Sequence, residues 1–366
     1  MTSLGIGLIG CGNISDAYLK GASHFPVLNI LACADINMEA ATAKAGQYGL
    51  KAQTVEALLG DPSIDVILNL TTPQHHVNID VSALKAGKHC YSEKPLGLSM
   101  EEAKQLVDLT AKTGLRLGCA PDTFLGGAHQ TARKIIDSGE IGSPVAGSAF
   151  MMVPGHERWH PNPDFYYQDG GGPLMDMGPY YLTDLINLFG PVASVCGSAK
   201  ATYESRTIGS GERKGQHFDV EVPTHISSLL NFHNGATVTM VTSFDVHKHE
   251  HSPIEIYGTK GSMIVADPNK FDGDITVSDG SGDWNLVKQL HIYGDANYRG
   301  IGLADMVEAI MKNQDHRASL KLSLHVLEIM ESIIVAAETG QSIDLQYMCE
   351  RPAPLDHTLP AGQLYT

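Results

Sequence analysis

The first 121 residues alternate short apolar runs with helical stretches, and this alternation constrains the fold more than any other feature of the chain. Runs such as DVILNL at 65–70 and KHCYS at 88–92 show little polar alternation, as strands covered by helices on both faces require. Segments with helical periodicity separate them, among them 38–48 and 77–86. This order predicts a parallel, doubly wound α/β sheet.

Beyond residue 121 the pattern changes to long runs in which apolar and polar residues alternate. THISSLLNF at 224–232 and ATVTMVTSFDV at 236–246 flank HNG, a tight-hairpin signature. At 366 residues the chain also exceeds the roughly 100 to 200 residues usual for one domain. We therefore expect two domains, one over residues 1–121 and an α/β domain over 122–366 with a mainly antiparallel sheet.

The net charge of the chain excludes nucleic acid and anionic membranes as partners. The chain has 25 Lys and Arg against 41 Asp and Glu, a formal charge of −16 that repels nucleic acid and anionic membrane surfaces. Its six cysteines are scattered without a C-x-x-C pair, which indicates small buried apolar residues. The apolar start is too short and glycine-rich for a signal peptide or a membrane span. We expect a cytoplasmic, reduced protein.

The stretch GLIGCGNIS at 7–15 is nearly the G-x-G-x-x-G fingerprint of dinucleotide binding. Gly10 makes the turn after the first strand, and Gly12 lets a pyrophosphate approach the backbone at the helix N-terminus. Ser15 replaces the third glycine, at a helix-packing position where a small serine fits. A plain strand-to-helix turn is the alternative interpretation of this motif alone.

Asp35 strengthens the dinucleotide interpretation. It ends the second predicted strand about 20 residues after the glycine motif, where an acid accepts hydrogen bonds from the adenosine ribose. Ile36 and Asn37 follow, with no adjacent arginine to bind a ribose 2′-phosphate. The sequence therefore predicts NAD in preference to NADP.

A candidate catalytic lysine follows the strand at 88–92. The tripeptide Glu93, Lys94, Pro95 stands at the carboxyl end of that strand, where a doubly wound sheet forms its ligand crevice. A lysine at this point can reach both the nicotinamide ribose and a substrate hydroxyl. The alternative is a surface salt bridge ahead of a turn.

The run GGGPLMDMGPYYLTDLINLFG at 170–190 predicts a glycine-led amphipathic helix. Pro179 lacks an N–H and clashes with a preceding helical turn, so it fits without strain only in the first turn of a helix. We therefore expect the helix to start near Asp176. Asp176 and Tyr180 then lie one turn apart on a polar face that is free to meet a cleft. Asp176 could instead be an N-cap.

A loop with many aromatic and polar residues, PGHERWHPNPDFYYQDGGG at 154–172, precedes this helix. Aromatic faces beside hydrogen-bonding groups suit a polyhydroxylated ring, which makes His156, Trp159 and His160 candidate substrate contacts. The alternative is a loop that packs against a neighbouring subunit. Asp122, at the start of the second domain, could bind substrate or cap a turn.

Several of these motifs together resemble the Gfo/Idh/MocA family, named for glucose-fructose oxidoreductase, inositol dehydrogenase and rhizopine catabolism. The resemblance rests on 10–15, Asp35, TTPQHH at 71–76, AGKHCYSEKPL at 86–96 and the glycine-led helix, and it extends over nearly the whole chain. It implies a Rossmann domain followed by an α/β domain whose large open sheet often serves oligomerisation. We therefore expect a homo-oligomer, a dimer or tetramer, formed through that sheet.

The resemblance also implies roles for individual residues. Lys94 and Asp176 match the catalytic lysine and aspartate of the family, and Tyr180 stands where many members carry histidine. The 71–76 stretch is similar to the T-P-x-x-x-H cofactor contacts of the family, with Thr72 in place of proline. The expected cofactor-binding residues are Gly10, Gly12, Asn13, Ile14, Asp35, Thr71, Thr72, His76, Glu93 and Lys94. The expected substrate-binding residues are Lys94, Asp122, His156, Trp159, His160, Asp176 and Tyr180.

The function implied by the resemblance is NAD-dependent oxidation or reduction of a hydroxyl or keto group on a sugar, a sugar derivative or a cyclitol. Lys94 would polarise the oxygen, Asp176 would orient the site and Tyr180 would take the proton. A phenol with its usual pKa of about 10 is a poor base at neutral pH, so this role requires the nearby charge of Lys94. His156 and His160 are the alternative proton carriers.

Two other functions are alternatives to the dehydrogenase. One is a glycosidase that uses bound NAD for transient oxidation and elimination, and the other is a cofactor-binding regulator without turnover. The intact lysine and aspartate argue against the regulator. We expect no metal site, because His247, His249 and His251 alternate along the chain without an identifiable acid or cysteine partner.

Overall fold

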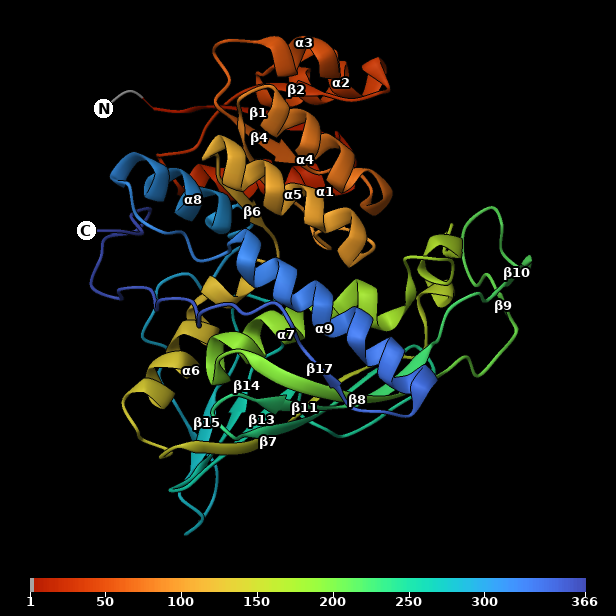
Figure 1. Ribbon diagram of the computed structural model, residues 1–366, viewed down its shortest axis with the longest axis vertical. Coiled ribbons are helices and arrows are strands. Elements are labelled where there is room, and N and C mark those ends of the chain that lie inside the picture. The colour runs from red at the N-terminus through yellow and green to blue at the C-terminus, as the bar shows by residue number, and fades with distance from the viewer. Residues whose placement is uncertain (1–2) are drawn as a thin grey trace. The chain divides into compact units, whose positions relative to one another are not determined.

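The computed structural model describes residues 3–366 and divides into two compact units (Figure 1). The first unit contains the chain up to Gly126, His291–Leu324 and Pro352–Thr366. The second unit contains Gly127–Leu290 and His325–Arg351. No helix within residues 3–366 is long and apolar enough to cross a membrane.

The sequence-based division at 121/122 differs from these units in two respects, the first being that the boundary lies at 126/127. Two later segments, 291–324 and 352–366, return to the first unit. Helical periodicity shows that a segment buries one face, but it does not show which unit that face packs against. The first helix of these returning segments, Ile301–Lys312, packs on the last strand of the first sheet.

The first unit is a six-stranded sheet in which every pairing is parallel. The strand order β3-β2-β1-β4-β5-β6 is that of a doubly wound dinucleotide-binding fold, which confirms the predicted fold class. All residues of β1 and β4 are buried, because helices cover both faces. The strands are β1 Gly5–Ile9, β2 Asn29–Ala34, β3 Lys51–Gln53, β4 Val66–Asn69, β5 His89–Ser92 and β6 Leu117–Cys119.

Helix boundaries in this unit follow local capping chemistry. The Ser99 side chain accepts a hydrogen bond from the Glu102 backbone N–H at 3.3 Å and so caps α5. Gly114, with φ of 70°, ends the same helix. The helices are α1 Asn13–Gly21, α2 Met38–Tyr48, α3 Val55–Gly60, α4 His76–Lys85, α5 Met100–Thr113 and α8 Ile301–Lys312, with short 3₁₀ turns η1 Ala22–His24, η2 Pro73–His75 and η3 Thr123–Leu125.

The second unit is built on a nine-stranded sheet of order β16-β15-β14-β13-β7-β12-β11-β8-β17. Its pairings are antiparallel except for β7 with β12, which confirms a mainly antiparallel sheet. The predicted hairpin is β11 with β12. The strands are β7 Pro144–Met152, β8 Val192–Lys200, β11 His225–Phe232, β12 Thr237–Ser243, β13 Ile254–Gly258, β14 Ser262–Val265, β15 Thr276–Ser278, β16 Asn285–Leu286 and β17 Ile343–Asp344.

Helices α6 and α7 contact one face of this sheet, through β14 for α6 and through β7, β11 and β12 for α7. On β11 the covered face carries Ile226, Leu230 and Phe232, all buried, whereas Leu229 on the other face is exposed. A separate two-stranded arm is formed by β9 Ser205–Thr207 and β10 His217–Asp219. The helical elements are α6 Gly127–Asp137, α7 Gly172–Phe189, η4 His156–Arg158, η5 Asp164–Tyr166 and α9 Leu320–Thr339, of which the residues up to Leu324 are counted with the first unit.

Helix α7 begins earlier than the sequence predicted. The expected start near Asp176 was wrong, because α7 starts at Gly172 and Pro173 occupies its first turn. Pro179 lies inside the helix, where it removes one backbone hydrogen bond. Burial of every residue from 178 to 189 outweighs that loss. Asp176 therefore lies inside the helix rather than at its N-cap.

A buried ion pair joins α6 to α7. His129 Nδ1 lies 2.8 Å from Asp184 Oδ2, and His129 Nε2 lies 2.9 Å from the Lys270 carbonyl oxygen. Burial disfavours the charged imidazole, but the Asp184 carboxylate and the Lys270 carbonyl outweigh burial and raise the pKa of His129. The pair therefore fixes the helix that carries Asp176 against its neighbour.

Replacing His129 with asparagine should lower the free energy of unfolding by about 3–5 kcal/mol, because Asp184 loses its buried cationic partner. The raised pKa of His129 means that its contribution is fully present below the unfolded-state pKa of about 6.5 and is lost as pH rises through the folded-state pKa. Urea unfolding of both proteins between pH 5.5 and 9 measures this.

The control is Lys51→Met, which removes an exposed ion pair with Asp61 at 3.7 Å and should leave the unfolding midpoint unchanged. An equal loss in both variants, or a His129 effect independent of pH, would contradict the assignment.

Candidate functional site

The turn between β1 and α1 is shaped by two glycines with different surroundings. Gly10 has φ of 101°, and a Cβ there would lie 2.5 Å from the carbonyl carbon of Leu70. Gly12 faces open space, because a Cβ built on it meets nothing within 4 Å. Ser15 is fully buried and donates to the Gly12 carbonyl at 2.6 Å, which explains the departure from a third glycine.

A cavity of about 760 Å³ lies beside this turn. The structure brings together on its wall five of the predicted cofactor residues, Gly10, Gly12, Asp35, Thr71 and Thr72. Predicted residues Asn13 and Ile14 form the first turn of α1, directly after Gly12. The cavity is therefore bounded by the glycine turn, the end of β2 and the loop after β4.

The Asp35 carboxylate is held in one orientation at the end of β2. Its Oδ2 accepts a hydrogen bond from the Cys11 backbone N–H, and its Oδ1 accepts one from the Asn37 backbone N–H, both at 2.8 Å. Ile36 beside it is 98% exposed and brings no positive charge. A hydroxyl donor that enters the cavity meets a fixed acceptor there.

The predicted cofactor residue His76 has both ring nitrogens hydrogen-bonded within the protein. Its ring is buried, with Nδ1 2.7 Å from the Pro95 carbonyl oxygen and Nε2 2.9 Å from the Thr71 carbonyl oxygen. It ties the loop after β4 to the turn that contains Lys94. The preceding residue, His75, lines the cavity instead, and only the local geometry of η2 distinguishes the two.

Lys94 follows β5, and the carboxylate of Glu93 fixes its backbone. Glu93 Oε2 accepts from the Lys94 backbone N–H at 2.9 Å, and Glu93 Oε1 accepts from the Tyr18 hydroxyl of α1 at 2.7 Å. Burial, followed by the Glu93 charge, holds the pKa of Tyr18 well above its usual value, so the phenol keeps its proton. Glu93 thus holds the turn at Lys94 through hydrogen bonds within the protein. The sequence analysis did not identify Tyr18 as part of this arrangement.

Asp122 is fully buried. Its Oδ2 accepts hydrogen bonds from the backbone N–H groups of Gly300 at 2.8 Å and Gly302 at 3.1 Å, at the start of α8. Of the two alternatives that the sequence left open, this geometry supports the cap.

In the second unit, His156 and Asp176 form a pair. His156 Nε2 lies 3.2 Å from Asp176 Oδ2, and the two side chains are 14% and 19% exposed. Asp176 precedes Tyr180 by one turn of α7, and Tyr180 is 5% exposed. Three rings surround the imidazole, with centroids at 4.5 Å for Tyr166, 4.5 Å for Phe244 and 5.4 Å for Trp159.

The other two candidate substrate contacts in this loop are Trp159 and His160. Trp159 is 59% exposed, and its ring stands 5.4 Å from that of His160. His160 Nδ1 accepts from the Asn162 backbone N–H at 3.1 Å. The structure therefore brings His156 to Asp176, whereas the His160 ring bonds within its own loop.

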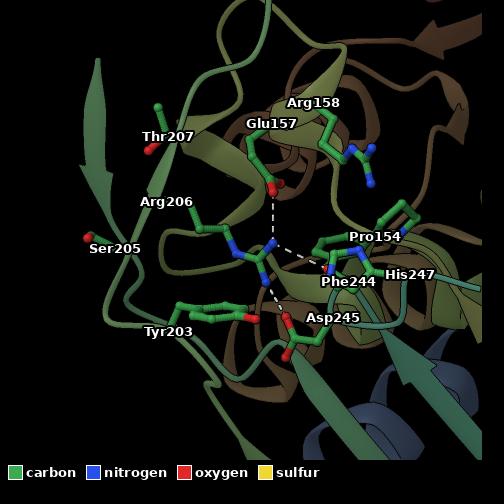
Figure 2. Close-up of a pocket in the computed structure, with 10 residues that line it drawn as sticks. All are labelled: Pro154, Glu157, Arg158, Tyr203, Ser205, Arg206, Thr207, Phe244, Asp245 and His247. Carbon is green, nitrogen blue, oxygen red and sulfur yellow. Dashed lines mark hydrogen bonds and ion pairs between the residues drawn. The ribbon is translucent and has the colours of Figure 1, made fainter. Parts of the chain in front are cut away.

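A second cavity of about 460 Å³ is lined in part by a buried group of charges that the sequence did not reveal (Figure 2). Arg206 from β9 lies between Glu157 and Asp245, and its Nη1 is 2.8 Å from Glu157 Oε1. Arg206 Nη1 also donates to the Phe244 carbonyl oxygen at 3.3 Å. The residues were missed because Arg206 is 49 residues from Glu157 and 39 from Asp245.

The three alternating histidines do not share a strand face, because β12 ends at Ser243. His251 stacks on Phe150 with a centroid distance of 4.1 Å. Among the described residues, no cluster of three or more His, Cys, Asp or Glu side chains could hold a metal ion.

Two sequence profiles match the chain, one for each unit's principal sheet. "Oxidoreductase family, NAD-binding Rossmann fold" matches residues 4–120, and "GFO/IDH/MocA C-terminal domain" matches residues 129–264. The structure of levoglucosan dehydrogenase in complex with NADH and L-sorbose superimposes with a TM-score of 0.81 at 23% identity, over 94% of this chain and 99% of that one.

Two curated relatives extend the comparison. The chain is 27% identical over 350 residues to the 1,5-anhydro-D-fructose reductase of Ensifer adhaerens, over 93% of this chain and 98% of that protein. It is 24% identical over 274 residues to the inositol 2-dehydrogenase of Rhizobium meliloti (strain 1021), over 75% of this chain and 79% of that protein. Since the two profiles together span more than half of its length, the chain belongs to the Gfo/Idh/MocA family of NAD-binding oxidoreductases.

Proposed function

We propose that the protein is an NAD-dependent dehydrogenase that interconverts a hydroxyl and a keto group on a sugar, a sugar derivative or a cyclitol. The observation that carries the redox assignment is the fixed Asp35 carboxylate on the wall of the 760 Å³ cavity beside the glycine turn. The substrate class is supported by the relatives, which are named for an anhydrosugar, levoglucosan and inositol.

The residues around the first cavity fit the cofactor. The open space beside Gly12 leaves room for a pyrophosphate, and the N-terminus of α1 follows directly. Asp35 would accept hydrogen bonds from the adenosine ribose, and the exposed Ile36 offers no cation to a 2′-phosphate. When bound, NAD supplies the acceptor for a hydride from the substrate carbon.

The remaining chemistry belongs to side chains of the protein. Lys94 would donate a hydrogen bond to the reacting oxygen and stabilise the negative charge that develops on it. Asp176 and Tyr180, one turn apart on α7, would bind substrate hydroxyls. The proton of the reacting hydroxyl needs an acceptor, and Tyr180 and His156 are the two candidates.

We also propose a homo-oligomer formed through the nine-stranded sheet. The face of this sheet opposite α6 and α7 carries Leu229, at 40% exposed, and Tyr257, at 37% exposed. Half-buried Phe150 and Val241, which are register partners on β7 and β12, lie on the same face. Apolar side chains on an uncovered sheet face favour self-association.

A substrate screen tests the function directly. Monosaccharides, anhydrosugars, glycosides and inositols are each incubated with NAD, and reduced cofactor and organic products are measured. Net NADH with a free polyol supports the proposal. Glycoside cleavage without net NADH would instead identify the NAD-dependent glycosidase, and tight cofactor binding without turnover would identify a regulator.

The two glycines of the turn should respond differently to alanine. Gly12→Ala should leave the melting temperature unchanged but weaken NADH binding at least about tenfold, because the methyl group occupies the space left for pyrophosphate. Gly10→Ala should destabilise the fold by about 1–3 kcal/mol, because alanine disfavours φ of 101° and its Cβ meets the Leu70 backbone. Thermal unfolding and fluorescence titration with NADH measure the two effects. Equal melting temperatures for the two variants would contradict this account.

Cofactor preference should reverse when the charge at the ribose site is reversed. In the double variant Asp35→Ser, Ile36→Arg, kcat/KM for NADP relative to NAD should rise at least about tenfold, because a guanidinium replaces the carboxylate beside the 2′ position. Steady-state kinetics with both cofactors measure the ratio. Ile36→Gln is the control, since it adds no charge and should leave the preference for NAD in place. A wild-type enzyme that favours NADP would refute the assignment.

A further inference from the structure

We propose that His156, paired with Asp176, takes the proton from the reacting substrate hydroxyl. This inference rests on the proposed dehydrogenase function and assigns its proton-accepting group. In the oxidative direction bound NAD would accept the C–H electron pair as hydride, and His156 would accept the O–H proton on its imidazole. The products are a carbonyl compound, NADH and a protonated His156, which returns its proton to solvent.

The geometry of the pair defines which ring nitrogen is available. An ionised Asp176 only accepts hydrogen bonds, so the contact of 3.2 Å requires the proton on His156 Nε2. The lone pair then lies on Nδ1, which makes no hydrogen bond to any of residues 3–366. The Asp176 carboxylate also stabilises the imidazolium that forms, as carboxylate partners of catalytic histidines do.

His156 suits this step better than Tyr180 does. Histidine is the side chain that most often serves as a general base, because its imidazole can both accept and release a proton, whereas a tyrosine phenol needs activation by a neighbouring charge. The His156 side chain is 14% exposed, and the whole Tyr180 residue is 5% exposed. Tyr180 remains suited to donating a hydrogen bond to a substrate oxygen.

A buried hydrogen-bonded chain holds His156 in place. The Tyr167 hydroxyl accepts from the His156 backbone N–H at 3.1 Å and donates to Glu157 Oε2. Arg206 Nη1 donates to Glu157 Oε1, and Nη2 of the same guanidinium pairs with Asp245 (Figure 2). Burial, followed by Glu157, raises the pKa of Tyr167, so its hydroxyl keeps the proton that it donates.

This chain spans three segments of the second unit, the loop with η4, strand β9 and the residues after β12. Tyr167 is fully buried, and Arg206 is 8% exposed. Charged groups so placed hold one arrangement, because any other leaves a buried charge without a partner. Tyr167 and Arg206 are therefore positioning residues for His156.

The first test separates proton transfer from orientation. His156→Gln can keep a donor toward Asp176 but cannot carry a proton, so kcat should fall at least about 100-fold with KM changed less than about threefold. In His156→Ala, added imidazole should restore a measurable part of the lost rate, and it should not do so in Tyr180→Phe. Retention of kcat within about threefold in His156→Gln, or no effect of imidazole on His156→Ala, would overturn the proposal.

The second test addresses the positioning chain with a matched pair of variants. Tyr167→Phe removes the hydroxyl that links the His156 backbone to Glu157 and should lower kcat about 3- to 30-fold. In the His156→Gln background the same change should have no further effect on kcat, because it acts through His156. Tyr181→Phe is the control, since its buried hydroxyl donates to the Phe150 carbonyl at 3.3 Å on β7. An effect of Tyr167→Phe that is undiminished in the His156→Gln background would show a merely structural role.

A third readout requires no turnover. Nitrogen-15 spectra of labelled histidine near pH 9, with His156→Gln used to assign the signal, report which ring nitrogen is protonated. The proposal requires the Nε2–H tautomer in the wild type, and the Nδ1–H tautomer would overturn it. If no compound in the substrate screen is oxidised, the proposed function fails, whereas an Nδ1–H tautomer in an enzyme that does oxidise a substrate overturns the assignment of His156 alone.

Discussion

The carboxylate of Glu93 is the constraint on which the first half of the site depends. It accepts one hydrogen bond from the first helix, through Tyr18, and one from the backbone of Lys94. His76 reinforces the same turn from the loop after β4, through the Pro95 carbonyl. The lysine is therefore presented by a turn that is fixed from two sides, although it follows a strand of only four residues.

The second unit uses the same physical device with more charge. Its loop of 153–171 contains little regular structure beyond two short 3₁₀ turns, and loops of this kind are held in place by specific polar contacts. Arg206, Glu157 and Tyr167 supply those contacts behind His156. In both units a buried, hydrogen-bonded glutamate holds the residue proposed to act on substrate: Glu93 holds the backbone of Lys94, and Glu157 holds that of His156 through Tyr167.

The sequence correctly predicted those features that depend only on residues close together in the chain. The glycine turn, the acid at Asp35 and the two hairpin strands around 233–235 needed only periodicity and turn chemistry. The start of α7 was misjudged because burial of the helix outweighs the cost of Pro179. The pairing of His156 with Asp176, and the Arg206 group behind it, join residues that are far apart in the chain, and no periodicity encodes such a contact.

The division of the chain into units carries a consequence for how the protein is made. The first unit includes 352–366, and there Lys312 Nζ donates to the Tyr365 carbonyl oxygen at 2.7 Å while Glu308 accepts from the Leu364 backbone N–H at 2.7 Å. These contacts cannot form until the ribosome has released that segment. The nucleotide-binding half is thus translated first but completed last. Its six strands lie within residues 5–119, but α8 and the 352–366 segment are synthesised only after residue 290, so the early part of the chain must stay soluble without them.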